Sequence, residues 1–215
     1  TDNLQKKLFK EMTGRIQKDD TSVPYFKNGY WYYTRFEEAQ EYPIYCRKKG
    51  NLDEKESVML NVNELAKGYD YYAVGGLRIS KDNTILAYAV DTLSRRVYTY
   101  KFLNLETGKL LKDEIINTEP GGAWSNDNRT FYYTTKNNIT LLSEKIWRHQ
   151  LNTDQGEDVM MYHEQDPSFY ISVKKSKSDD YIVISCRSTL ITDYHVLSAQ
   201  EPLGSFRQFT PRNGP

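Results

Sequence analysis

The side chains best suited to acid–base or metal chemistry in this chain are those of its three histidines, His149, His163 and His195. Their spacing supports neither role. His163 is followed by Glu164, but the second histidine of the zinc-binding H-E-x-x-H motif is absent. His149 and His195 lie in strand-like runs, so we expect both to be structural or to face solvent. The histidine spacing alone therefore indicates no metal site.

Motifs for nucleophilic catalysis and for nucleotide binding are also missing. Residues 122–125 and 204–206 fail the G-x-S-x-G spacing that exposes a serine at a strand-to-helix turn. No glycine-rich phosphate-binding motif occurs. Carboxylates are so numerous that a glycosidase-like pair could be drawn between almost any two of them. From the residues we therefore expect no catalytic residue, no cofactor and no metal in this chain.

Three aspartates, Asp82, Asp127 and Asp179, recur at the same point before successive apolar runs. We expect them to cap turns through backbone hydrogen bonds rather than to bind a ligand. The two cysteines, Cys46 and Cys186, lie in apolar strand-like runs and are expected to be buried free thiols. Since a disulfide scaffold uses more cysteines in fewer residues, a reducing, cytoplasmic location is the default expectation.

The elements that position these residues belong to an internal repeat. Ser80, Ser125 and Ser176 each open a short polar segment that leads into an apolar run, and they lie 45 and 51 residues apart. Residues 27–29 precede a similar run. Propeller blades repeat every 40 to 50 residues or so, whereas a β-sandwich, the rival architecture, has turns every 8 to 12 or so. The repeat therefore predicts an all-β fold, a partial β-propeller of about four four-stranded blades with one N-terminal helix.

The predicted boundaries follow from the turn signals. We expect a linking helix in residues 1–21 and an incomplete propeller in residues 22–215. The blades are expected to cover residues 22–70, 71–118, 119–165 and 166–215. Sixteen strands are expected in four groups of four, with separate strands at residues 110–116 and 122–125 and a short helical turn within residues 60–67.

The N-terminal segment has helical rather than strand periodicity. Leu4, Leu8, Met12 and Ile16 recur every four residues between charged and polar side chains, which predicts an amphipathic helix. One interpretation is that the helix packs on its own domain. The other is that these four residues form an interdomain face that docks on another domain or subunit, which is favoured because a propeller blade has no place for a leading helix.

Charge and hydropathy exclude two classes of partner. Lysine plus arginine and aspartate plus glutamate number 29 each, so no net field attracts nucleic acid or an anionic membrane. No apolar run approaches the 18 or so residues of a membrane span, and the N-terminus is too charged for a secretory signal. We expect no nucleic-acid partner and no membrane partner.

Several blocks of sequence resemble a known family. The resemblance is carried by residues 23–25, 28–35 (NGYWYYTR), 42–47 (YPIYCR), 86–99 (LAYAVDTLSRRVYT) and 146–149 (IWRH), with 169–170 and 188–189 continuing it in order. The chain resembles the oligopeptidase B (protease II) group of the prolyl oligopeptidase family of serine peptidases, over essentially its whole length.

The resemblance implies a function that this chain performs only in part. In that family a seven-bladed propeller covers a C-terminal α/β-hydrolase domain with a Ser-Asp-His triad, and the propeller restricts access to short peptides. Oligopeptidase B is similar to trypsin in cutting after Arg or Lys. The chain would then be the N-terminal part of the propeller, acting in substrate gating and size selection, with the hydrolase domain as its partner. None of the triad residues can be mapped onto this sequence.

A second hypothesis is a non-catalytic propeller-like protein-interaction module. Such a module would have to close its ring by oligomerising, because an open array of four blades leaves long strand edges unpaired.

Overall fold

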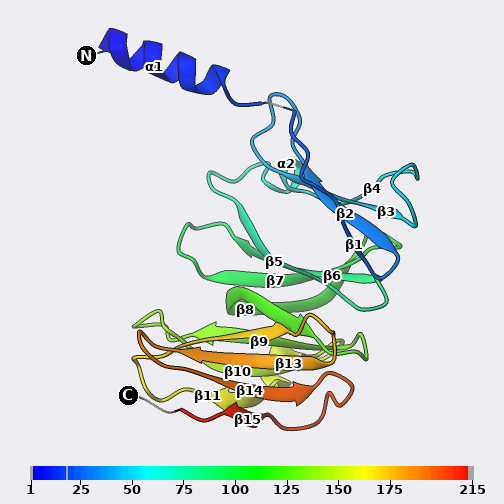
Figure 1. The fold of residues 1–215 in the computed structure, drawn as a ribbon, viewed down its shortest axis with the longest axis vertical. Helices are drawn as coiled ribbons and strands as arrows, with labels where there is room; N and C mark the ends of the chain where they lie inside the picture. The colour runs from blue at the N-terminus through cyan, green and yellow to red at the C-terminus, as the bar shows by residue number, and fades with distance from the viewer. Residues whose placement is uncertain (1, 18, 213–215) are drawn as a thin grey trace. The chain divides into compact units, whose positions relative to one another are not determined.

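The computed structural model describes residues 2–17 and 19–212 (Figure 1). The chain forms two compact units, of which the first ends at Gly68 and the second begins at Tyr69. The described residues contain fifteen strands, all in antiparallel sheets, and one long N-terminal helix, which confirms the predicted fold class. No helix among them is both long and apolar enough to cross a membrane.

The first unit contains the N-terminal helix and one four-stranded sheet. Its elements are α1 (Asp2–Gly14), β1 (Tyr25–Lys27), β2 (Tyr30–Arg35), β3 (Ile44–Lys49), β4 (Ser57–Asn61) and α2 (Val62–Leu65). The strands are hydrogen-bonded in the order β1-β2-β3-β4. Asn28 and Gly29 have φ angles of 48° and 82°, which suits the two-residue turn that joins β1 to β2. The α2 helix confirms the helical turn predicted within residues 60–67.

The second unit contains a seven-stranded sheet and a four-stranded sheet. The first has the order β11-β10-β9-β8-β7-β6-β5 and the second β12-β13-β14-β15. The strands of the larger sheet are β5 (Ala73–Ile79), β6 (Ile85–Asp91), β7 (Tyr98–Asn104), β8 (Leu110–Trp124), β9 (Thr130–Lys136), β10 (Ser143–Gln150) and β11 (Val159–His163). The rest of the unit comprises the 3₁₀ helix η1 (Gln155–Glu157) and the strands β12 (Tyr170–Lys175), β13 (Tyr181–Arg187), β14 (Thr192–Ser198) and β15 (Arg207–Thr210).

One strand, β8, runs through two of the predicted strand groups. Thr118 pairs with Tyr98 of β7 on one side and with Thr135 of β9 on the other. The two predicted strands at residues 110–116 and 122–125 are therefore one, and the expected sixteen strands are fifteen. The register shifts between Thr118 and Gly122, where a side chain would not fit because a Cβ would lie 2.3 Å from the Phe131 ring.

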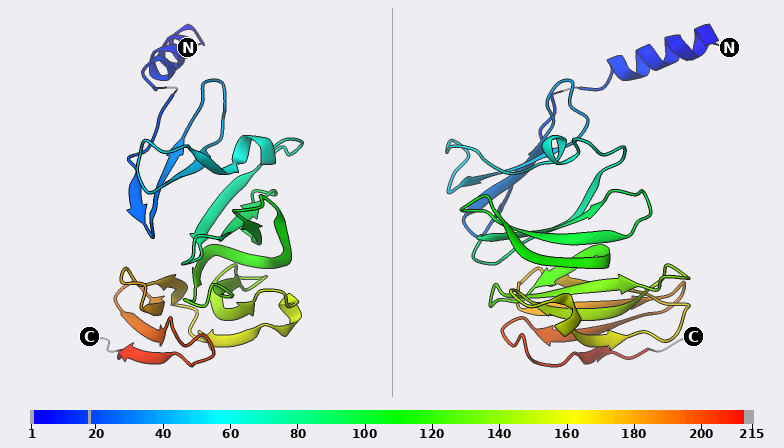
Figure 2. Two further views of the ribbon diagram at one scale, coloured as in Figure 1. Left: turned by 90° about the vertical axis from the view of Figure 1, so that its right-hand side faces the viewer. Right: turned by 180° about the vertical axis from the view of Figure 1, so that it is seen from behind.

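The core of the second unit lies between stacked strand groups (Figure 2). Phe102 of β7 meets Trp124 of β8 and Phe131 of β9 with ring centroids 5.7 and 5.5 Å apart, both edge to face. A second cluster joins β8–β10 to β12 and β13. Each fully buried large apolar side chain contributes about 1.5–3 kcal/mol, so sheet-on-sheet contact is the main source of stability here. This face-to-face stacking is what blades of a propeller require, because one blade cannot bury its own apolar faces.

Candidate functional sites

The turns at the start of the repeats are capped by aspartate in two cases. Asp82 Oδ1 accepts hydrogen bonds from the N–H and the hydroxyl of Thr84, at 3.1 and 2.9 Å. Asp127 Oδ1 accepts from the N–H groups of Arg129 and Thr130, both at 3.0 Å. Burial alone would raise the pKa of Asp82, but hydrogen bonds from the Ser80 hydroxyl and from Thr84 outweigh it and lower the pKa. The predicted capping role is confirmed for both residues.

Asp179 takes a different place in its turn from the one we predicted. Its φ is 62°, which matches the 64° of Asn83 and the 59° of Asn128, so Asp179 is the left-handed residue of the turn. The position of the two capping aspartates is taken by Ser178, whose hydroxyl lies 3.1 Å from that of Ser176. The repeat therefore conserves the shape of the turn, although a serine replaces the carboxylate.

These turns also bond to one another across neighbouring strand groups of the second unit. Asn128 Oδ1 accepts a hydrogen bond from the N–H of Asp82 at 3.1 Å. Asn126 donates from Nδ2 to the carbonyl of Asp179 at 3.0 Å and accepts at Oδ1 from Lys175 Nζ at 2.5 Å. The polar segments that mark the repeat thus hold successive groups of strands in register at one end.

His149 lies in a fully buried polar network in the core of the second unit. Its Nδ1 is 2.8 Å from Asp158 Oδ1 and its Nε2 is 3.2 Å from Asp113 Oδ1. Tyr133 donates its hydroxyl hydrogen to the other oxygen of Asp158 at 2.7 Å. The imidazole stacks at 5.8 Å on the ring of Phe102. Burial alone would lower the pKa of His149, but the two carboxylates outweigh it and raise the pKa.

This network is a structural clamp. The imidazole, with 1% of its side chain exposed, is bonded on both sides to carboxylates, which leaves neither ring nitrogen for a nucleophile. A protonated His149 donates to Asp113 on β8 and to Asp158, which precedes β11, so one side chain of β10 links segments on both sides of it, with β8 reached across β9. Within the part of the chain that the structure describes, no serine hydroxyl hydrogen-bonds to a histidine. We assign no catalytic residue to this chain.

The two other histidines lie on different strands. His163 is exposed at the end of β11, whereas His195 is half-buried on β14. Both cysteines are buried free thiols, as predicted. Residue spacing does not predict that Asp113, 36 residues before His149, is its partner, because that pairing depends on how β8, β9 and β10 align.

The proposed interdomain face lies on α1 and just beyond it. Leu4, Leu8 and Met12 are exposed by 61%, 47% and 67%, and Phe9 by 69%. The helix ends at Gly14, so Ile16 lies outside it rather than on its fourth turn, although it too is exposed. No residue of α1 is buried, so the apolar face has no cover among the described residues.

An open hollow of about 640 Å³ lies on the second unit over β8, β9 and β10. It is lined by apolar, amide and charged side chains, among them Ile116, Tyr133, Lys136, Trp147 and Gln155. The indole N–H of Trp147 already donates a hydrogen bond to the hydroxyl of Thr135 on β9 at 2.9 Å. The hollow brings together no set of groups with a defined chemistry.

The sheets, the repeat and the exposed helix are those expected of a propeller segment, and comparison with known proteins decides the family. A model of the N-terminal β-propeller domain of prolyl oligopeptidases matches residues 1–213. The chain belongs to the prolyl oligopeptidase family. Its relatives within the family include dipeptidyl aminopeptidase BI of Pseudoxanthomonas mexicana, which is 42% identical over 97% of the chain. Protease 2 of Moraxella lacunata is 30% identical over 91% of the chain.

Solved structures of the family share the fold. Oligopeptidase B from Leishmania major superposes with a TM-score of 0.90 over 98% of the chain, at 28% identity. The family member described here spans only part of the length of these proteins: 31% of the aminopeptidase, 29% of protease 2 and 30% of the Leishmania enzyme. The predicted resemblance is confirmed, and it concerns the propeller region.

Proposed function

We propose that this chain is the N-terminal propeller segment of a serine oligopeptidase and acts there in substrate gating and size selection. The observation that carries the proposal is the match of residues 1–213 to the family's propeller domain. The greater length of the relatives supports a catalytic domain elsewhere in the same polypeptide. In this proposal residues 1–21 serve as the linking helix and residues 22–215 as the incomplete propeller. Its blades cover residues 22–70, 71–118, 119–165 and 166–215.

The contribution of the chain to catalysis is steric. Stacked sheets with buried faces form a stiff wall, and a ring built from such blades admits short, flexible peptides while it excludes folded proteins. The chemistry, serine attack assisted by a histidine base and an oxyanion hole, belongs to the proposed C-terminal α/β-hydrolase domain. The exposed apolar side chains Leu4, Leu8 and Met12 of α1 are the proposed docking face for that domain, because burying them would remove a large apolar surface from water.

For the specificity of the whole protein we propose cleavage of short peptides after Arg or Lys, which the likeness to oligopeptidase B supports. A second candidate is release of dipeptides from a free N-terminus, favoured by the 42% identity to a protein named dipeptidyl aminopeptidase. A reducing, cytoplasmic location is proposed because both thiols are free and buried.

Two Arg-containing amide substrates that differ only in an N-terminal block test the specificity. An oligopeptidase cleaves the blocked and the free form of the dipeptide amide, whereas a dipeptidyl aminopeptidase cleaves only the free form. The assay uses the polypeptide translated from the whole reading frame, with a serine-directed inhibitor as control. Size selection is tested by placing the same Arg site in a short peptide and in a folded protein. Equal cleavage rates for the two would refute gating.

The 215-residue chain by itself tests whether catalysis requires the proposed C-terminal domain. It is expected to cleave neither amide, and inhibitor-sensitive turnover by this chain would refute the proposal. The competing interaction module predicts a defined oligomer of the chain and a reading frame that stops near its end. Light scattering and the sequence of the frame beyond residue 215 separate the two.

A further inference from the structure

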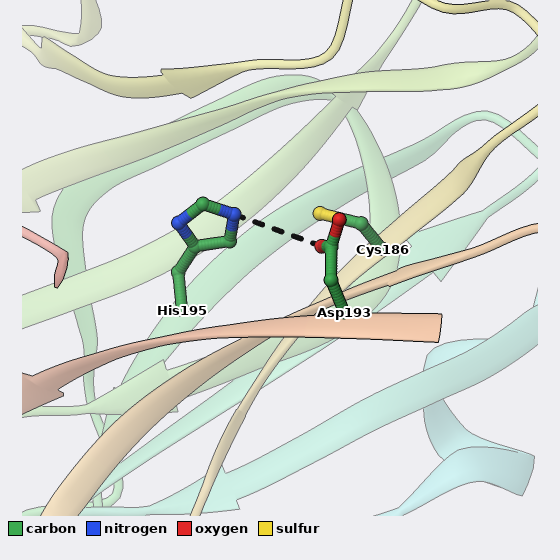
Figure 3. Close-up of side chains that lie close together, drawn as sticks. All are labelled: Cys186, Asp193 and His195. Atoms are coloured by element: carbon green, nitrogen blue, oxygen red, sulfur yellow. Dashed lines mark ion pairs between the residues drawn. The ribbon is translucent and has the colours of Figure 1, made fainter. Parts of the chain in front are cut away.

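Cys186, Asp193 and His195 bring a thiol, a carboxylate and an imidazole together at one end of the last sheet (Figure 3). Cys186 of β13 pairs directly with Asp193 of β14. His195 follows two residues later and lies on the same face of the strand, since side chains alternate along it. The three potential ligand atoms lie within 4.8 Å of one another. Strand register, rather than proximity in sequence, creates this cluster.

One carboxylate oxygen of Asp193 accepts a hydrogen bond and the other does not. Arg212 donates from Nε to Asp193 Oδ2. Arg212 is itself fixed by Glu164, whose Oε2 accepts from Nη2 at 2.5 Å, and by the ring of Phe169 beneath it at 3.8 Å. Asp193 Oδ1 is fully buried and receives no hydrogen bond from any described residue. A buried carboxylate oxygen without a donor is costly, which points to a missing cationic partner.

The other two groups converge on that oxygen. His195 Nε2 is 3.7 Å from Asp193 Oδ1, beyond hydrogen-bonding distance. The thiol of Cys186 is fully buried and reaches the hydroxyl of Tyr162 at 3.4 Å.

The charges near the cluster favour a divalent cation. Two carboxylates, Asp193 and Glu164, face a single guanidinium, Arg212, which leaves one net negative charge. When Cys186 loses its proton to a metal, the net charge becomes two negative and one divalent cation balances it. A metal that displaces the thiol proton has to overcome burial, which raises the pKa of Cys186 to about 12.

We propose that Cys186, Asp193 and His195 form a binding site for one Zn²⁺, with a water as the fourth ligand. Sulfur, nitrogen and oxygen donors in a tetrahedral arrangement suit zinc. Zinc bonds of about 2.0–2.3 Å place ligand atoms about 3.3–3.8 Å apart, which is closer than the 4.8 Å within which the three atoms lie here, so the ligands have to move together on binding. Arg212 acts as the outer-sphere partner that leaves Oδ1 free to ligate. Binding breaks the S–H bond, forms the Zn–S bond and releases one proton to solvent.

The site would cross-link β13 and β14 and would hold Arg212, and through it Glu164, in place. The proposed site does not depend on the peptidase function. Metal analysis therefore tests it separately from any cleavage assay.

Titration of the purified, reduced and metal-free protein with Co²⁺ tests the thiolate ligand. We expect a thiolate-to-cobalt charge-transfer band together with the visible bands of tetrahedral cobalt, both displaced by Zn²⁺. Cys186→Ser is expected to abolish the charge-transfer band. Cys46→Ser is the matched control, because Cys46 is the other buried cysteine and should leave the band unchanged. Circular dichroism checks that each variant is folded.

Calorimetric titration with Zn²⁺ measures affinity and the released proton. We expect one proton released per bound Zn²⁺, seen as a dependence of the heat on buffer ionisation enthalpy. His195→Gln, at a half-buried position, should weaken binding by more than the 10- to 100-fold or so that loss of an outer-sphere partner costs. This variant decides the question if Cys186→Ser does not fold. Absence of a band, or the same band and affinity in the variants, would overturn the proposal.

Discussion

Removal of the His149 imidazole tests the most deeply buried polar network of the chain. In His149→Leu the carboxylates of Asp113 and Asp158 remain in the core without the cation between them. The change removes two charge-assisted hydrogen bonds, of 2.8 and 3.2 Å, each of which contributes about 1.5–3 kcal/mol. Breaking a buried ion pair by removing one partner costs about 3–5 kcal/mol. We therefore expect a loss of about 3–5 kcal/mol in the free energy of unfolding, a large part of the roughly 5–15 kcal/mol of a typical domain.

The loss should depend on pH in a defined direction. The folded state raises the pKa of His149 above its ordinary value of 6.5. The unfolded state therefore releases this proton first as pH rises, and the stabilisation is present below about pH 6.5 and disappears as pH passes the folded pKa. The difference between wild type and His149→Leu should be largest in mild acid and should shrink in alkali.

Urea unfolding at a series of pH values, followed by circular dichroism, measures both effects. His163→Leu is the matched control, because the side chain of this histidine is exposed and its removal should leave the stability nearly unchanged. Two results would refute the reasoning. A loss below about 1 kcal/mol would show that the network adds no more than one ordinary hydrogen bond. A loss that does not vary with pH would show that His149 is not protonated in the folded state.

Three further predictions concern backbone shape, turn capping and packing. Gly76→Ala should lower the free energy of unfolding by at least about 3 kcal/mol, because the φ of Gly76 is 61° and the added Cβ would lie 2.5 Å from a backbone oxygen. Gly121→Ala is the control. Since the space around Gly121 is open, this variant should change stability by less than about 1 kcal/mol in the same urea assay. Asp127→Ala should lower the free energy of unfolding by about 1–2 kcal/mol and speed amide hydrogen exchange in its turn, because two backbone N–H groups lose their acceptor. Unchanged exchange would contradict the capping role. Phe102→Ala should lower stability by about 3–5 kcal/mol in thermal unfolding, and a small loss would mean that the aromatic cluster repacks.

The features that the sequence predicts well are local ones. Alternation of apolar residues locates the strands, and the polar segments that begin at Ser80 and Ser125 locate the turns, because both signals lie within a few neighbouring residues. The four-residue spacing from Leu4 to Met12 predicts α1. The family is identifiable for the same reason, since its blocks are short and contiguous.

The features that the sequence misses depend on register. Residues 117–121 contain a proline and a glycine and indicate a turn, yet the chain continues there as β8. The bond from His149 to Asp113 and the approach of Cys186 to His195 exist only once strands have paired. The predicted capping role of Asp179 is wrong because its turn carries two adjacent acidic residues, and the sequence does not indicate which of them has a left-handed backbone.

The continuity of β8 has a consequence for how the second unit opens. A strand hydrogen-bonded to β7 along its first half and to β9 along its second cannot leave one neighbour without disturbing the other. The seven strands from β5 to β11 should therefore behave as one cooperative unit, whose central amides exchange with solvent at a common rate. The last four strands form a separate sheet, and the connection between β11 and β12 is where local opening should begin.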